Sequence, residues 1–200
     1  MKPILFACFL MLLFGCEQPP QLNKLPTEAV ILAFGDSLTY GTGASPQRNY
    51  PSVLSQLTGL QVINAGIPGE ISRNGRKRLP DILDKQQPDL LILIHGGNDI
   101  LRKIPPQQTQ ENIRQMIEEA NRRNIDVVLF GVPRPGLIMM SSAALYQQIA
   151  ENQAVVHDLN TLPEILGDPA LKSDMIHPND RGYRIIAENV YRLLQQQGAL

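Results

Sequence analysis

The sequence predicts an α/β fold, a three-layer α/β/α sandwich built around a five-stranded parallel sheet. Short runs rich in Leu or β-branched residues alternate along the chain with segments whose apolar residues recur at helical spacing. Such alternation is typical of βα units, whose parallel sheet is buried on both faces. With 200 residues, 43% of them hydrophobic, the chain suits one domain with a sizeable core.

The five expected strands are residues 29–34, 61–64, 90–94, 127–131 and 154–157. One expected helix carries its apolar residues at Ile113, Met116, Ile117 and Ala120, with Thr109 as the N-cap. The same period predicts a last helix through Tyr183, Ile186, Ala187, Val190 and Leu194. No internal repeat or second domain is indicated.

The N-terminus predicts a signal peptide over residues 1–15, because Lys2 precedes an uncharged run of h-region length. The sequence around Cys16 resembles the bacterial lipobox, although Phe14 stands where a smaller residue is usual. We therefore expect lipidation at Cys16, a flexible tether over 16–27 and a folded domain over 28–200. This places the protein in the bacterial envelope, anchored to the membrane and facing the periplasm. Glu17 after the Cys favours the outer membrane.

The composition limits the partners and cofactors. The 18 basic and 19 acidic residues nearly cancel and form no block of like charge, so we expect no nucleic-acid partner. With Cys8 in the signal peptide and Cys16 acylated, the folded part has no internal disulfide and no thiolate metal site. No metal or other cofactor and no obligate protein partner is indicated.

Four polar motifs carry the chemistry. They are residues 35–39 (Gly-Asp-Ser-Leu-Thr), 64–66 (Asn-Ala-Gly), 96–99 (Gly-Gly-Asn-Asp) and 174–178 (Asp-Met-Ile-His-Pro). The first three follow the first three expected strands, and the fourth precedes the last helix. Because ligands of open α/β sheets bind beyond the carboxyl ends of the strands, we expect the motifs to meet at one edge.

Together the motifs predict serine-based ester hydrolysis. Ser37 is the candidate nucleophile, His177 the base that takes its proton, and Asp174 the group that orients the imidazole. The expected oxyanion donors are the backbone N–H groups of Ser37 and Gly66 and the side-chain amide of Asn98. Glycine suits position 66 because a substrate oxygen can approach a backbone without a Cβ.

Other His and Asp residues compete for these roles. The competitors are His95, His157, Asp168 and Asp180. His95 and His157 are better explained as residues at strand ends, and Asp180 as the N-terminal carboxylate of the last helix. Asp36 and Asp99 are expected to hold their loops by hydrogen bonds to the backbone.

The combined motifs resemble the SGNH (GDSL) hydrolase family, and within it the periplasmic thioesterase, arylesterase and lysophospholipase branch. The resemblance spans residues 29–194, implies the flavodoxin-like SGNH fold and assigns the roles above to Ser37, Gly66, Asn98, Asp174 and His177. Two departures, His95 and the turn 67–70, imply an altered substrate preference.

The substrate is indicated only by loops. Residues 133–140 form an apolar segment able to contact an acyl chain, and Arg134 is a candidate for a polar head group. We expect acyl esters, thioesters or lysophospholipids as substrates. The alternatives are a carbohydrate O-acetyl esterase of the cell envelope and a catalytically silent lipoprotein that binds a ligand.

Overall fold

The computed structural model describes residues 20–134 and 141–200. The predictions made for Cys16 and for residues 1–19, and those made for residues 135–140 of the apolar loop, lie outside the described residues. Within the described part, no helix is long and apolar enough to cross a membrane.

A five-stranded, fully parallel sheet forms the middle layer, in the order β2-β1-β3-β4-β5. The strands are β1 (Val30–Gly35), β2 (Gln61–Gly66), β3 (Leu90–Ile94), β4 (Asp126–Phe130) and β5 (Val156–Asp158). Each overlaps one expected strand, and β3 has the expected bounds. The predicted fold class is confirmed.

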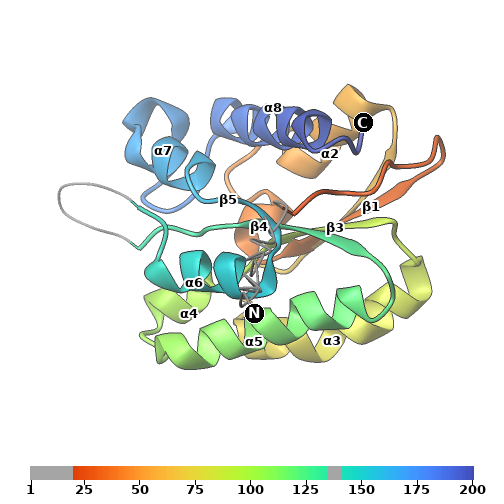
Figure 1. Ribbon diagram of the computed structural model, residues 1–200. Helices are drawn as coiled ribbons and strands as arrows, with labels where there is room; N and C mark the ends of the chain where they lie inside the picture. Colours follow the sequence, from red (N-terminus) through yellow and green to blue (C-terminus); the bar gives the residue numbers. More distant parts are fainter. Residues whose placement is uncertain (1–19, 135–140) are drawn as a thin grey trace, which may run out of the picture.

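Helices cover both faces of the sheet (Figure 1). They are α1 (Ser37–Tyr40), α2 (Tyr50–Thr58), α3 (Ser72–Gln86), α4 (Gly97–Leu101), α5 (Pro106–Asn121), α6 (Ala144–Gln153), α7 (Thr161–Gly167) and α8 (Asp180–Gln196), with a short 3₁₀ turn, Pro169–Leu171. Helices α2 and α8 lie on one face, and α3, α5 and α6 on the other. Every residue of the face predicted for the last helix is buried in α8.

One predicted helix start is wrong. Thr109 is not the N-cap of α5, because the helix begins earlier, at Pro106, with Pro105 as the cap residue. Proline is well suited to the first turn, where its missing N–H removes no helical hydrogen bond. Thr109 is buried inside the helix, and its hydroxyl donates to the Asp99 carboxylate at 3.3 Å.

The sheet brings the first three strand ends to one edge. Gly35 is paired with Gly66 in β2 and with Ile94 in β3, so the three strands end level with one another. All five residues of β3 are buried, whereas β2 at the sheet edge is partly exposed. The loops that follow these strands therefore emerge side by side from a rigid support.

The expected tether is shorter than predicted. Leu22 is buried against the core, and the backbone N–H and side-chain amide of Asn23 both donate to the Asp126 carboxylate, at 2.6 and 3.1 Å. The N–H of Leu25 donates to the carbonyl of Ala199 at 2.9 Å. The segment has no apolar period because it is attached at isolated points, which a search for periodicity does not detect.

Candidate active site

Ser37 is the first residue of α1, directly beyond the end of β1. Asp36 caps this helix, and its carboxylate accepts the N–H of Leu38 at 3.1 Å. The turn into the helix is tight: a Cβ on Gly35 would lie 1.9 Å from the carbonyl oxygen of Ile94. The local sequence thus fixes the backbone at Ser37 and leaves its side chain partly exposed.

Ser37, His177 and Asp174 form a hydrogen-bonded relay. The Ser37 Oγ lies 3.0 Å from His177 Nε2, and His177 Nδ1 lies 2.7 Å from Asp174 Oδ2. With the imidazole hydrogen on Nδ1 and directed at the carboxylate, Nε2 accepts the hydroxyl hydrogen of Ser37. The three residues predicted for catalysis therefore have the geometry of a nucleophile, a base and its orienting group.

The Asp174 carboxylate is held by its own loop. Its Oδ1 accepts the backbone N–H groups of Ile176 and His177, both at 2.8 Å. Partial burial acts to raise its pKa, but the bonds from the His177 ring and these N–H groups outweigh it and lower the pKa below the ordinary value. Asp174 is therefore ionised at neutral pH, when it stabilises the imidazolium that forms during proton transfer.

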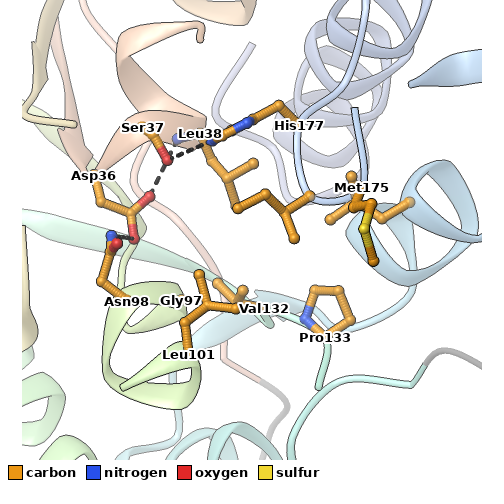
Figure 2. Close-up of a pocket in the computed structure, with 12 residues that line it drawn as sticks. Asp36, Ser37, Leu38, Gly97, Asn98, Leu101, Val132, Pro133, Met175 and His177 are labelled. Atoms are coloured by element: carbon orange, nitrogen blue, oxygen red, sulfur yellow. Dashed lines mark hydrogen bonds between the residues drawn. The ribbon is translucent and has the colours of Figure 1, made fainter. Parts of the chain in front are cut away.

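Asn98 lies opposite Ser37, in the first turn of α4. Its Nδ2 donates one hydrogen to the Asp36 carboxylate at 3.2 Å (Figure 2), which orients the amide and leaves its second hydrogen for a ligand. Burial raises the pKa of Asp36, while the bonds from Leu38 and Asn98 act in the opposite direction. The expected role of Asp36 and Asp99 in holding loops is confirmed, since Asp99 accepts the N–H of Ser72 at 2.7 Å.

The structure does not support Gly66 as an oxyanion donor. Its N–H donates to the side chain of Asn64 at 3.0 Å, so it is not directed at Ser37. The space expected for a substrate oxygen is filled, because a Cβ on Gly66 would lie 2.1 Å from the backbone nitrogen of Tyr40. Glycine is required here for the close packing of α1 against β2.

The competing residues lie away from the relay or serve it indirectly. His157 is exposed in β5, Asp168 caps the 3₁₀ turn, and Asp180 begins α8 and accepts the N–H of Ser45 at 2.7 Å. His95 is fully buried, with both ring nitrogens in hydrogen bonds. None of them displaces His177 as base or Asp174 as its partner.

A pocket opens beside the Ser37 hydroxyl (Figure 2). One end is polar, with Asp36, Ser37, Asn98 and His177. The other walls are mainly apolar and are formed by Leu38, Leu101, Val132, Pro133, Leu166, Met175 and Ile176. Of the predicted apolar loop, Pro133 contributes to this wall. Among the described residues, no group of three or more His, Cys, Asp or Glu side chains is placed to hold a metal ion.

Comparison with known proteins agrees with this geometry. The model of the GDSL-like lipase/acylhydrolase family matches residues 33–185, which include every residue of the relay. The chain belongs to this family. As a GDSL-family member it is a carboxylic ester hydrolase, and the predicted family and enzyme class are confirmed.

Relatives within the GDSL family come from several bacteria. Thioesterase 1/protease 1/lysophospholipase L1 of Escherichia coli K12 is 31% identical over 172 residues, covering 82% of this chain and 83% of the relative. An arylesterase of Vibrio mimicus is 30% identical over 170 residues, covering 80% and 85%. A crystal structure of TesA superposes with a TM-score of 0.74 at 26% identity, over 84% of this chain and 99% of that one. These similarities place the chain in the thioesterase and arylesterase branch.

Sequence reasoning linked the turn 67–70, which contains Glu70, only to substrate preference, and it missed Arg78. The buried Glu70 and the partly buried Arg78 form an ion pair beneath the loops of the site, with Arg78 Nη2 2.7 Å from Glu70 Oε2. Nothing in their spacing distinguishes them from surface charges, because the two side chains meet only when α3 folds back under the turn that follows β2.

Proposed function

We propose that this GDSL-family hydrolase cleaves acyl esters and thioesters, including those of lysophospholipids, with Ser37 as nucleophile and His177 as base. The observation that carries the proposal is the combination of the Ser37–His177–Asp174 relay with a pocket whose walls are mainly apolar. An ester carbonyl placed at the hydroxyl would have its acyl chain beside Leu101 and Val132, where apolar surface is removed from water.

The reaction follows from the relay. His177 Nε2 takes the proton as Ser37 Oγ attacks the carbonyl carbon, and Asp174 stabilises the resulting imidazolium. The imidazolium then protonates the leaving alcohol or thiol, which gives a Ser37 acyl ester. Water, activated by the same imidazole, hydrolyses this ester and restores the hydroxyl.

The developing oxyanion needs donors that are already in place. We assign two of them to the N–H of Ser37 and the amide of Asn98. The third is the N–H of Gly69 rather than that of Gly66. The backbone N–H of Glu70 donates to the carbonyl of Ile67 at 3.1 Å, and Gly69 has φ 78°, so residues 67–70 have the features of a type II turn. In such a turn the N–H of the third residue, here Gly69, takes no part in the turn's own hydrogen bond.

Two further observations support Gly69. Among the described residues its N–H has no hydrogen-bond acceptor, and a Cβ would meet only the end of the Arg102 side chain, at 3.9 Å. Arg102, which caps the C-terminus of α4, donates to the Gly69 carbonyl at 2.9 Å. That bond joins the turn to the short helix that carries Asn98.

We further propose that Cys16 is lipidated and anchors the domain in the bacterial envelope, facing the periplasm. The lipobox-like sequence supports this. Beyond it along the chain, Asn23 is attached to Asp126. Asp126 begins β4, so the chain joins the domain at the amino ends of the strands, whereas Ser37 lies beyond their carboxyl ends. Such an anchor would leave the site facing away from its membrane. Radiolabelled palmitate should enter the wild type but not Cys16→Ser.

The acyl preference is tested with p-nitrophenyl esters from acetate to palmitate. We expect a maximum of kcat/KM at medium chain length. Met175 lines the pocket and its side chain is highly exposed, so Met175→Ser should fold normally and lower kcat/KM for octanoate by about 3- to 10-fold, while acetate is unaffected.

The control is Leu57→Ser, a partly exposed apolar residue on α2 remote from the pocket. It should leave the chain-length profile unchanged. Activity confined to acetate would contradict the acyl-chain assignment and favour the carbohydrate O-acetyl esterase.

A further inference from the structure

A buried ionic cluster lies beneath the loops that follow β1, β2 and β3. At its centre is Glu70, only 8% exposed, whose two carboxylate oxygens accept Arg78 Nε at 2.8 and 2.9 Å. Its Oε2 also accepts Arg78 Nη2 at 2.7 Å and lies 3.2 Å from Nε2 of the fully buried His95. One carboxylate is thus shared by side chains from α3 and from the end of β3.

Arg78 connects this carboxylate to the ends of two strands. Its Nη2 donates to the carbonyl of Ala65 at 2.8 Å and to that of Gly35 at 3.2 Å. Its guanidinium also lies over the Phe34 ring, 4.0 Å from the centroid. Gly35 is the last residue of β1 before the turn that carries Ser37, so Arg78 holds that strand end against β2.

His95 connects the same carboxylate to the turn that carries Asn98. Its Nδ1 accepts the N–H of Gly96 at 2.9 Å, which places the ring hydrogen on Nε2 and directs it to Glu70. The His95 carbonyl accepts the Tyr146 hydroxyl at 2.7 Å. The β3–α4 turn is therefore tied on one side to α6 and on the other to the turn after β2.

We propose that Glu70, acting through Arg78 and His95, is a positioning residue that sets the oxyanion hole. It does not contact substrate. It fixes the turn that carries Gly69 and the turn that carries Asn98 relative to Ser37. Its carboxylate is bonded to His95, which follows β3, and to Arg78, whose Nη2 is bonded in turn to the carbonyls at the ends of β1 and β2. This inference rests on the proposed function, which assigns the oxyanion donors to those turns.

The charge of Glu70 is needed for this role. Burial acts to raise its pKa, but the hydrogen bonds from His95 and Arg78 outweigh it and lower the pKa, so the carboxylate is ionised at neutral pH. A neutral glutamine of the same shape offers one oxygen where the carboxylate offers two. Its amide hydrogens would face the N–H donors of Arg78 or His95, and the turns must move to separate these opposed donors.

The test compares Glu70→Gln with Glu111→Gln. Glu111 also pairs with an arginine, Arg114 at 2.6 Å, but on the exposed face of α5. We expect Glu70→Gln to lower kcat for p-nitrophenyl esters by about 10- to 100-fold with KM within about 3-fold, as for loss of an interaction made in the transition state. Glu111→Gln should change neither constant.

A double-mutant cycle with Asn98→Ala distinguishes positioning from general loosening. If Glu70 acts through the oxyanion hole, Glu70→Gln should cost at least about 3-fold less in the Asn98→Ala background than in the wild type, because only its effect on the turn that carries Gly69 remains. A full, additive loss in that background would overturn the proposal, as would a Glu70→Gln variant with the kcat of Glu111→Gln. Should Glu70→Gln fail to fold, Arg78→Lys takes its place with the same expectations, because lysine keeps the charge but not the paired bonds.

Hydrogen exchange separates this inference from the proposed function. A folded wild type that hydrolyses no ester would refute the proposed function and leave the cycle without a readout. Exchange then decides the positioning claim. Amides of residues 66–72 and 95–99 should exchange at least about tenfold faster in Glu70→Gln than in Glu111→Gln, with α8 unchanged. Equal exchange in both variants would overturn it.

Discussion

Substituting Gly75 by Ala should destabilise the protein, although alanine is the better helix former. Gly75 is buried within α3, where His95 packs directly against it. A Cβ at this position would lie 2.3 Å from His95 Nε2 and 2.8 Å from its Cδ2. These separations are far below van der Waals contact, so the helix or the ring must move.

The size of the effect follows from how firmly the ring is held. His95 is fully buried, and its nitrogens are bonded to Glu70 and to the N–H of Gly96. Overpacking of this kind costs about 1–3 kcal/mol, and a lost bond to Glu70 costs about 1 kcal/mol more. The helix propensity of alanine returns about 1 kcal/mol. We therefore expect the free energy of unfolding to fall by about 1–3 kcal/mol.

Urea unfolding followed by circular dichroism measures this change. The matched control is Gly167→Ala at the end of α7, where a Cβ would meet no atom within 4 Å. That variant should be as stable as the wild type within about 0.5 kcal/mol. If Gly75→Ala is as stable as this control, the ring is not held as described, and the reasoning from the buried cluster is refuted.

Three further predictions concern single groups. Asn98→Ala should lower kcat by about 10²–10³-fold through loss of one oxyanion donor, measured with p-nitrophenyl esters; a change below 3-fold would contradict its role. Asp174→Asn should lower kcat by about 10²-fold. The amide oxygen of the asparagine would accept the N–H groups of Ile176 and His177, so its NH₂ would face His177 Nδ1 and favour the imidazole tautomer with its hydrogen on Nε2, which cannot accept the Ser37 proton. An unchanged rate and pH–rate profile would refute this. Because the Glu70 pKa is lowered from 4.5 on folding, its stabilisation is present above pH 4.5 and lost as the pH falls through the folded value. The free energy of unfolding, measured with urea at a series of pH values, should therefore fall less steeply below pH 4.5 in Glu70→Gln than in the wild type. An equal slope in the two proteins would contradict this prediction.

The sheet and the relay could be predicted because their signals are local. The buried strands are continuous apolar runs, and β3, apolar at every position, was predicted with its observed bounds. Ser37 stands in a short motif at the end of β1, and His177 stands with Asp174 in a short motif just before α8. Parallel topology then brings the motifs to one edge without knowledge of any side-chain contact.

The errors arise where tertiary contacts decide. Thr109 has a typical N-cap side chain, but the Pro105–Pro106 pair starts the helix earlier and Asp99 binds its hydroxyl. Gly66 was predicted as an oxyanion donor from its motif at the end of β2, but the direction of its N–H depends on the local turn, and the N–H donates to Asn64. The Pro68-Gly69 pair was the available signal, because it favours a type II turn with a free central N–H.

The buried cluster had no sequence signal of this kind. Glu70 and Arg78 are eight positions apart, and His95 follows β3, 25 positions beyond Glu70. Their pairing depends on α3 returning beneath the strand ends, which no periodicity describes. The glycine at position 75 is explained only once the ring that fills its space is known.

The most direct test of the central claim is the rate of p-nitrophenyl octanoate hydrolysis by the wild type and by Ser37→Ala, with both proteins shown to be folded. Removing the hydroxyl removes the nucleophile and leaves the pocket and the His177–Asp174 pair in place. We predict turnover by the wild type and a loss of at least about 10³-fold in kcat in the variant. The claim that Ser37 is the nucleophile of an acyl-ester hydrolase would be contradicted by a folded Ser37→Ala protein that keeps the wild-type rate. A folded wild type with no turnover on any acyl ester would contradict it as well.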